Sequence, residues 1–343
     1  MSYSFNQYLL LGFVTFLFVA ALTPLMRKIA IKTGVVDKPN AAHKTHKEPV
    51  PYLGGVAIVI GVVVISLAAV LIKDFSTKNL LMALSILIPA KVMALMGLID
   101  DVKGLAPWPR LIVQTVTGLI VAGILIVTNT IGTPANNIVI DAFITIFWIV
   151  GITNSINFFD NLDGGAAGAI AAASFFSFLI AFAQGQILVS ALAIVIAGAM
   201  IGFLLWNKVP AKIYMGDSGA LFLGILISVL TIRLNPNVKP VINSWAVPVM
   251  LLAVPILDTC VAVISRLSRR ISPFTGGRDH LSHRLIRIGI ERKKAALSLW
   301  TLSVVFAFGA YLVVKSGNSV ITLASLILWL GLFLFFIRIP ATD

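Results

Sequence analysis

Eleven stretches of this sequence are each long and apolar enough to cross a lipid bilayer as a helix, which takes about 20 residues. They cover approximately residues 5–26, 52–72, 79–98, 110–129, 138–156, 164–183, 187–206, 217–233, 244–265, 295–314 and 319–338. Lipid offers the backbone no hydrogen-bond partners, so each stretch must satisfy its own amides and carbonyls, as a helix does. The sequence therefore predicts an all-α polytopic integral membrane protein with about eleven transmembrane helices.

The composition supports this fold class and excludes several others. Hydrophobic residues make up 59% of the 343 residues and charged residues only 11%, whereas a soluble domain carries about 25% charged residues. The mean hydropathy is +1.02. A soluble fold of this length could not hide so much apolar surface, which excludes an ordinary cytosolic enzyme and a disordered chain. The single cysteine, Cys260, allows no intrachain disulfide and so excludes a disulfide scaffold.

The basic residues predict how the chain lies in the membrane. Twenty of the 26 Lys and Arg residues fall on one side of the predicted spans and five on the other, while Lys91 lies inside a span. Cytoplasmic loops carry the excess of Lys and Arg. We therefore expect a protein of the inner (cytoplasmic) membrane whose N-terminus lies outside and whose C-terminus lies in the cytoplasm. The first span is expected to be retained as a helix and not cleaved as a signal peptide. The net charge of +13 then reflects topology, and we expect no nucleic acid as a partner.

The acidic residues gather on the same side as the basic ones. Ten of the 13 Asp and Glu residues are predicted to be cytoplasmic, although acids contribute little to membrane orientation. This asymmetry indicates a functional site on that face, within a single transmembrane catalytic domain covering residues 1–343. The site is expected to be built from the cytoplasmic loops 27–51, 99–110, 154–165, 207–219 and 266–294.

The paired acids Asp100 and Asp101 close the third predicted span. Adjacent carboxylates repel each other, so one pKa tends to rise unless a cation binds between them. Such a pair suits a general base or a Mg²⁺ site. The simpler interpretation is two solvated acids at a helix end.

A second group of oxygen donors follows the fifth predicted span. Asn154, Asn157, Asp160 and Asp163 recur every three residues, so on a helix they lie along one face. Oxygen donors are what a hard divalent cation prefers, although a helix cap followed by a glycine turn is the simpler interpretation. Asp217 stands where the eighth span begins, as either an N-cap or a metal ligand.

Two further loops carry cationic side chains. His280 and His283 are three residues apart with several Arg nearby, which suggests phosphate recognition beside a metal ion, or a plain juxtamembrane basic cluster. A zinc site is disfavoured because no cysteine lies close by. In the first loop, Lys44 and His46 are candidates for contacting an anion, or ordinary residues of a cytoplasmic loop.

Five short motifs occur in a specific order on this face. They are Pro-x-Pro-x-x-Gly-Gly from Pro49, Gly-x-Ile-Asp-Asp from Gly97, Asn-x-x-Asn-x-x-Asp-x-x-Asp-Gly from Asn154, Tyr-Met-Gly-Asp-Ser-Gly from Tyr214 and His-x-x-His from His280. The chain thereby resembles the polyprenyl-phosphate N-acetylhexosamine-1-phosphate transferases across nearly all its spans. The bacterial branch that primes cell-envelope polymers such as O-antigen and teichoic acid is the most similar.

The resemblance implies an activity, a cofactor and partners. Members of that family transfer a sugar-1-phosphate from a UDP-N-acetylhexosamine to a polyprenyl phosphate, such as undecaprenyl phosphate, and release UMP. They use Mg²⁺, with Mn²⁺ as an alternative ion. For this chain, UDP-GlcNAc is the favoured donor, direct attack by the lipid phosphate is favoured over an aspartyl intermediate, and a homodimer is compatible with the sequence.

The resemblance also implies roles for individual residues. Asp217 would bind Mg²⁺, Asp100 would act as the base on the lipid phosphate, and Asp101 would assist. Asn157, Asp160 and Asp163 match the family's nucleotide and metal loop, which adds Asn157 to the metal site. Substrate contacts are expected from Lys44, His46, Tyr214, Arg278, His280, His283 and Arg284, with Tyr214 stacking on uracil. Relatives usually carry another His where Ser282 stands.

Two other functions stay open. A phospho-N-acetylmuramoyl-pentapeptide transferase is disfavoured because that branch tends to have contiguous His residues. A transporter of an anionic substrate would place ionisable groups near the middle of the membrane. Here the acids lie at helix ends on one face, and only Lys91 is at such depth.

Overall fold

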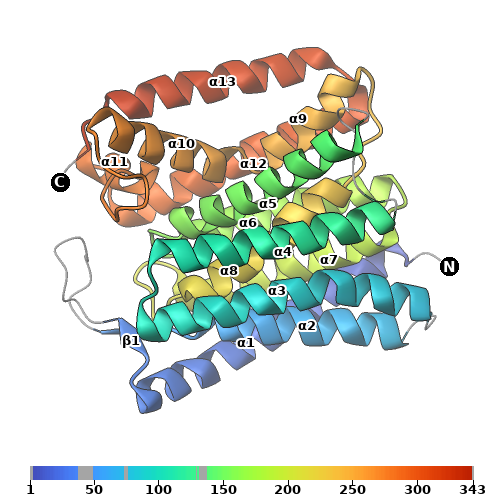
Figure 1. The fold of residues 1–343 in the computed structure, drawn as a ribbon, viewed down its shortest axis with the longest axis horizontal. Helices are drawn as coiled ribbons and strands as arrows, with labels where there is room; N and C mark the ends of the chain where they lie inside the picture. The colour runs from blue at the N-terminus through green and yellow to red at the C-terminus, as the bar shows by residue number, and fades with distance from the viewer. Residues whose placement is uncertain (1–2, 38–48, 73–75, 129, 131–136, 342–343) are drawn as a thin grey trace.

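A computed structural model describes residues 3–37, 49–72, 76–128, 130 and 137–341, without the side chain of Lys78. This part of the chain forms a bundle of helices (Figure 1). It also contains one small antiparallel sheet made of two strands, each two residues long. The elements are α1 (Phe5–Thr33), β1 (Val36–Asp37), β2 (Val50–Pro51), α2 (Gly54–Ile72), α3 (Thr77–Lys103), α4 (Pro107–Val127), α5 (Ile138–Phe159), α6 (Gly165–Ala183), α7 (Ile187–Asn207), α8 (Gly216–Arg233), α9 (Val241–Leu251), α10 (Ala253–Ser268), α11 (Leu281–Arg287), α12 (Arg292–Ser316) and α13 (Ser319–Arg338).

The predicted fold class is confirmed. Ten helices in the described part of the chain are long and apolar enough to span a membrane, and α9 with α10 can supply an eleventh span. Several helices extend beyond the predicted spans. The first helix runs to Thr33 and ends at Gly34, whose positive φ of 72° suits glycine. The first of the predicted site loops therefore begins seven residues later than the predicted residue 27.

The predicted span at 244–265 is not one straight helix. It is broken at Leu252, where α9 and α10 meet at an angle of 73°. Pro255 has no N–H to donate to the carbonyl of Leu251, and its ring would clash with that carbonyl in a continuous helix. Pro248 removes another hydrogen bond in the preceding turn. The two prolines therefore explain the break, which the hydropathy of the segment does not reveal.

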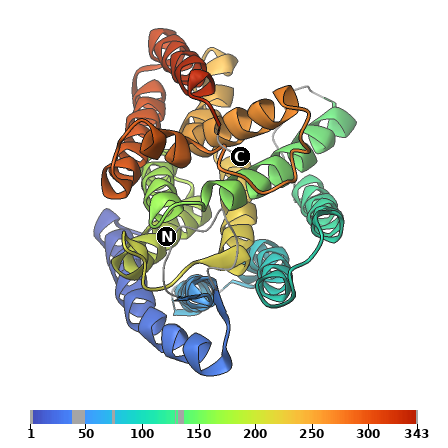
Figure 2. The same ribbon diagram turned by 90° about the vertical axis from the view of Figure 1, so that its left-hand side faces the viewer.

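The long helices run back and forth between two ends of the bundle. α1, α3, α5, α7, α10 and α13 all finish at the end where the C-terminus lies, and the N-terminus lies at the opposite end (Figure 1). Figure 2 views the molecule from that C-terminal end. The four described connections that were predicted to carry the site meet there, together with the described ends of the first loop. Lys44 and His46 lie outside the described residues.

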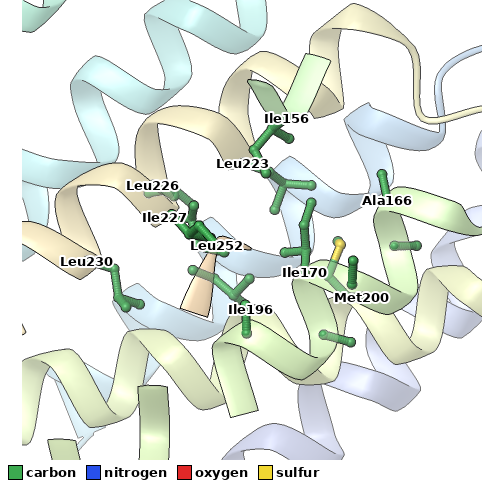
Figure 3. Packing of buried hydrophobic residues seen from close by; sticks show 14 of the residues in the cluster. Ile156, Ala166, Ile170, Ile196, Met200, Leu223, Leu226, Ile227, Leu230 and Leu252 are labelled. Atoms are coloured by element: carbon green, nitrogen blue, oxygen red, sulfur yellow. The ribbon is translucent and has the colours of Figure 1, made fainter. Parts of the chain in front are cut away.

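The helix α8 is the central element of the bundle. Nearly all its residues are buried, and it contacts α2, α3 and α5. Its side chains interdigitate with residues of α5, α6 and α7 and with Leu252 at the break before α10 (Figure 3). Two glycines let the backbones approach closely: a Cβ on Gly97 would lie 2.3 Å from the carbonyl oxygen of Asp217, and one on Gly55 would lie 2.2 Å from the amide nitrogen of Gly219. The start of α8 is therefore held tightly between α2 and α3.

Candidate active site

The carboxylate of Asp101 caps the start of α8. Its Oδ1 accepts the backbone N–H of Asp217 at 2.7 Å, and its Oδ2 accepts that of Ser218 at 3.1 Å. The helix has no capping side chain of its own, so Asp101 satisfies two otherwise unpaired amides and interacts favourably with the helix dipole. Asp101 thereby fixes Asp217 against the end of α3. This geometry favours a positioning role for Asp101 over direct assistance in the chemistry.

Asp100 and Asp217 share one cation, the guanidinium of Arg110. Arg110 Nη1 lies 2.7 Å from Asp100 Oδ2 and 3.2 Å from Asp217 Oδ2. Asp100 also accepts the backbone N–H of Leu105 at 2.6 Å, which fixes the short turn between α3 and α4. Two carboxylates this close repel each other unless a positive charge lies between them. Arg110 is not among the site residues predicted from the sequence, where its place at the start of a predicted span is the one feature that could have marked it.

Asn157 joins the same cluster from α5. Its Nδ2 donates to Asp217 Oδ1 at 2.6 Å, so four side chains from α3, α4, α5 and α8 converge. Asn154, one turn earlier, donates instead to Gln114 Oε1 at 2.6 Å and to the carbonyl of Val150 at 2.8 Å. The two asparagines thus have different functions, because Asn154 ties α5 to α4.

The loop after α5 is held by side chains from α7 and α12 and by the backbone of the loop after α7. Asp163 Oδ2 accepts the N–H of Ala211 at 2.9 Å. Gly164, with a φ of 70°, donates its N–H to Asn207 Oδ1 at 3.0 Å and accepts at its carbonyl from Trp300 Nε1 at 2.9 Å. These bonds fix the loop that carries Asp160, which lies near Asp163 and Asp101. Burial raises the pKa of the Asp160 carboxyl to about 7, and repulsion from Asp163 and Asp101 adds to this shift.

Tyr214 lies between the first loop and the start of α8. Its N–H donates to the carbonyl of Pro51 at 2.8 Å, and its carbonyl accepts from Gly54 at 3.0 Å. Its ring centroid lies 6.2 Å from that of Tyr52. Burial raises the pKa of the Tyr214 hydroxyl, so this group stays protonated near neutral pH. The ring is half-buried, which keeps part of it available to a ligand.

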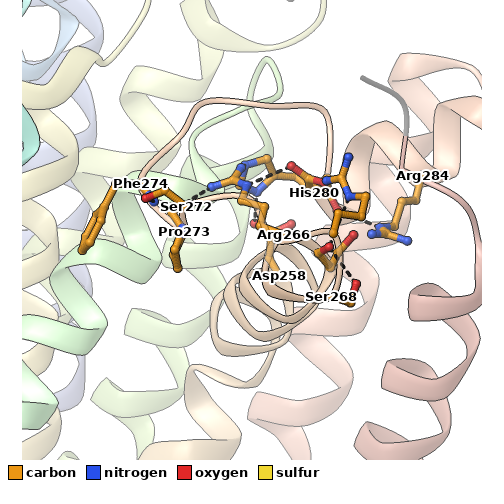
Figure 4. A network of polar contacts seen from close by, with 11 residues as sticks. Asp258, Arg266, Ser268, Ser272, Pro273, Phe274, His280 and Arg284 are labelled. Atoms are coloured by element: carbon orange, nitrogen blue, oxygen red, sulfur yellow. Dashed lines mark hydrogen bonds and ion pairs between the residues drawn. The ribbon is translucent and has the colours of Figure 1, made fainter.

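A buried polar network holds the segment between α10 and α12 (Figure 4). Arg266 donates to Asp279 Oδ2 at 2.8 Å and to the carbonyl of Pro273 at 2.8 Å. Asp279 also pairs with Arg269. Arg284 is 1% exposed and donates to backbone carbonyls of Asp279, Phe336 and Ile339. Arg284 therefore ties this segment to the end of α13, which favours a structural role over the predicted contact with substrate.

Two clefts are lined in part by the segment from Asn154 to Asp163. The first is lined by Pro107, Arg110, Leu111, Gln114, Asn154, Asn157, Phe158, Leu221 and Phe274. The second, of about 270 Å³, is lined by Asn161, Leu162, Asp163, Arg278, His283, Ile286, Arg287 and Arg292. The first cleft is small, about 20 Å³, and combines apolar side chains with three amide side chains and one arginine, whereas the second is strongly basic. The two clefts therefore suit different ligands.

His283 provides a test of how the second cleft responds to pH. Burial lowers the pKa of His283 to about 4, and the nearby positive charges of Arg278 and Arg292 add to this shift. As the pH falls from about 6.5 to about 4, the unfolded chain takes up a proton at this position before the folded chain does. The free energy of unfolding is therefore expected to decrease over this range, and less so in His283→Asn. Melting temperatures in detergent at pH 7.5 and pH 5 measure the difference, and equal losses in both proteins would contradict it.

The sequence of the chain is similar to those of known proteins. The model of the family named "Glycosyl transferase family 4" matches residues 83–235. A "Probable undecaprenyl-phosphate N-acetylglucosaminyl 1-phosphate transferase" of Bacillus subtilis is 32% identical over 334 residues, which is 95% of this chain and 87% of the relative. The chain belongs to the polyprenyl-phosphate N-acetylhexosamine-1-phosphate transferase family.

Other members of the family are similar over most of the chain. A "Decaprenyl-phosphate N-acetylglucosaminephosphotransferase" of Mycolicibacterium smegmatis is 31% identical, covering 84% of this chain and 77% of the relative. A "Phospho-N-acetylmuramoyl-pentapeptide-transferase" of Staphylococcus saprophyticus is 25% identical, covering 85% of this chain and 93% of the relative. The relatives of this chain therefore include both N-acetylglucosamine-phosphate transferases and a phospho-N-acetylmuramoyl-pentapeptide transferase.

The structure gathers most, but not all, of the predicted site residues of this transferase. Asp100 and Asp217 both pair with Arg110, and Asn157 donates to Asp217. Asp163, Arg278 and His283 line the second cleft. Ser282 is fully buried and donates its hydroxyl to Asn161 Oδ1. This hydrogen bond links the His motif directly to the loop after α5.

Proposed function

We propose that this chain transfers N-acetylhexosamine-1-phosphate, with GlcNAc-1-phosphate favoured, from a UDP-sugar to undecaprenyl phosphate. The products would be polyprenyl-diphosphate-sugar and UMP, in the first membrane step of a cell-envelope polysaccharide. The relatives named for undecaprenyl and decaprenyl phosphate support a lipid phosphate as acceptor. Their names also support an N-acetylglucosamine group in the donor. The bacterial cytoplasmic membrane is the proposed location, with the site facing the cytosol.

The observation that carries this proposal is the Asp100–Arg110–Asp217 cluster, whose arginine lines the first cleft. Arg110 bridges the carboxylates at 2.7 and 3.2 Å. Phosphoryl transfer requires a base, positive charge on the phosphates and precise positioning of two anions. The cluster offers a carboxylate base and a fixed cation in one place, and Arg110 and Asn157 connect it to the first cleft.

The residues of the cluster fit a magnesium ion. In the described part of the chain, no three His, Cys, Asp or Glu side chains are arranged as a closed metal site. Mg²⁺, however, is commonly bound by only one or two carboxylates together with substrate phosphates. Asp217 and Asn157, with Asp100 beside them, supply oxygen donors of this kind. When bound, the ion would neutralise the diphosphate of the donor, with Mn²⁺ as an alternative ion.

The clefts suggest how each substrate would bind. In the first cleft, Leu111, Leu221 and Pro107 give the start of a polyprenyl chain apolar contacts, and Arg110 lies within reach of its phosphate. The second cleft offers Arg278 and Arg292 to the diphosphate of a sugar nucleotide. The segment from Asn154 to Asp163 lines both clefts, so the two phosphate groups would meet beside it, at the Asp100–Arg110–Asp217 cluster.

The proposed reaction is a single displacement. Asp100 accepts the remaining proton of the lipid phosphate, and an oxygen of that phosphate attacks the sugar-bearing phosphorus of the UDP-sugar. The bond from that phosphorus to the bridging oxygen breaks, and UMP leaves with the bridging oxygen. Arg110 holds the attacking phosphate, and the arginines of the second cleft stabilise the charge on the leaving UMP.

A direct assay tests the proposal. Purified protein is incubated with undecaprenyl phosphate, Mg²⁺ and either UDP-GlcNAc, other UDP-N-acetylhexosamines or UDP-N-acetylmuramoyl-pentapeptide, and UMP release is measured. We expect release with a UDP-N-acetylhexosamine, dependent on both lipid and Mg²⁺. Release with the pentapeptide donor alone would assign the chain to the other branch. No release with any donor, from protein that melts cooperatively, would contradict the proposal.

A further inference from the structure

A buried carboxylate outside the reacting cluster organises the His motif. Asp258, on α10, is completely buried. Its Oδ2 lies 2.7 Å from His280 Nδ1, and its Oδ1 accepts the backbone N–H of Leu281 at 2.7 Å (Figure 4). Burying a carboxylate is unfavourable unless hydrogen bonds compensate for the lost water. Both contacts therefore contribute to the stability of this arrangement.

The position of Arg266 determines how His280 is bonded. Arg266 Nη2 lies 3.2 Å from His280 Nε2, and a guanidinium can only donate. His280 Nε2 must therefore accept, and Nδ1 carries the proton that is donated to Asp258. Both ring nitrogens are engaged within the protein, and the side chain is only 6% exposed. In this arrangement His280 has no nitrogen left for a substrate phosphate, which differs from the role expected from the sequence.

The same carboxylate fixes the start of α11. The residue before this helix, His280, provides no capping side chain, and Asp258 accepts the first helical amide in its place. The next two residues face the loop after α5: Ser282 donates to Asn161, and His283 lines the second cleft. A shift at the start of so short a helix would displace both side chains.

We infer that Asp258 is a positioning residue that sets His280 and α11, and thereby the sugar-nucleotide side of the site. The inference rests on the proposed function, because it assigns the second cleft to the sugar nucleotide. Asp258 does not reach the reacting atoms itself. Its effect passes through His280 and the first turn of α11 to His283 and Ser282.

Asp258→Asn is the sharpest single test. An amide that donates to His280 Nδ1 forces the imidazole proton onto Nε2, where it would face the N–H of Arg266. We expect KM for the UDP-sugar to rise about 10- to 100-fold, the range for losing a charge-assisted hydrogen bond. Both kcat and KM for undecaprenyl phosphate should change less than about threefold, because the Asp100–Arg110–Asp217 cluster makes no contact with Asp258. An unchanged KM for the UDP-sugar would overturn the inference.

Two sets of variants control for general damage. Asp141→Asn removes another buried carboxylate, in the first turn of α5 at the opposite end of the bundle, and should leave both KM values unchanged. His280→Ala should raise KM for the UDP-sugar as Asp258→Asn does. In His280→Asn the amide can donate to Asp258 from the Nδ1 position, so KM for the UDP-sugar should return most of the way to the wild-type value. An equal rise in KM for both His280 variants would overturn the inference. If Asp258→Asn fails to fold, these two variants test the inference in its place.

Two further measurements separate this inference from the proposed function. The double variant Asp258→Asn/His280→Ala should be no worse than either single variant, because both act through one contact. Additive losses would overturn the inference. Binding of UDP by calorimetry needs no transfer, and it should weaken in Asp258→Asn by the same factor as KM. A wild-type protein that binds UDP but releases no UMP would count against the proposed function alone.

Discussion

Asp100→Asn is expected to lower the rate of transfer about 10²- to 10⁴-fold near pH 6, the range for losing a general base. An asparagine fills the same space and can still accept the N–H of Leu105, which lies 2.6 Å from the carboxylate in the native protein. It cannot take a proton from the lipid phosphate. The defect should therefore appear in UMP release while the melting temperature in detergent changes little.

The pH dependence of the same variant distinguishes a base from a structural residue. A phosphate monoester loses its second proton with a pKa of about 6. The acceptor should therefore need Asp100 less as the pH rises, and the defect of Asp100→Asn should shrink between pH 6 and pH 8. A defect of constant size across this range would assign Asp100 another role. Asp141→Asn serves as the control, because that buried carboxylate lies at the far end of α5.

Asp217→Asn is expected to lower kcat about 10²- to 10³-fold, with little loss of stability. Asp217 receives Arg110 and Asn157 at the start of α8, and its position is fixed through the Asp101 cap. An asparagine at this position keeps the backbone bonds to Asp101 but removes the negative charge. The weaker binding of the metal ion should make the residual rate depend on a higher Mg²⁺ concentration.

Titrating Mg²⁺ in the transfer assay checks this expectation. The half-saturating concentration should rise in Asp217→Asn and stay close to the wild-type value in Asp141→Asn. Full activity at the wild-type Mg²⁺ concentration would exclude Asp217 as a metal ligand. A loss of activity accompanied by unfolding would instead assign it a structural role at the start of α8.

Arg110 illustrates what the sequence could not reveal. It is 107 residues from Asp217 along the chain, and among 26 basic residues nothing local marks it. Its importance comes from the short turn after α3, which places it beside Asp100, and from the packing of α8 against α3. The role of Asp101 is similar, because its partners at 217 and 218 are 116 and 117 residues away.

The His motif shows a second kind of limit. A spacing of three residues predicted that one helix face could present both His280 and His283. Instead His280 precedes α11 and turns toward Asp258, while His283 lies on the helix and lines the second cleft. Asp258 lies within the predicted span at 244–265, and nothing in the neighbouring sequence marks its partners 22 and 23 residues away.

The sequence by itself determined the number of spans and the motifs that identify the family. These properties are local, because hydrophobic length and short-range spacing are written in consecutive residues. It also predicted that the acidic residues of the motifs lie on one face. In the structure Asp100, Asp101, Asp160, Asp163 and Asp217 do lie at one end of the bundle. The tertiary structure alone decided that α9 and α10 form a broken span, that Asp101 caps α8, that Arg110 joins Asp100 to Asp217, and that Asp258 fixes His280. Each of these contacts joins residues from different helices or loops, so it depends on how the helices pack and not on any single segment.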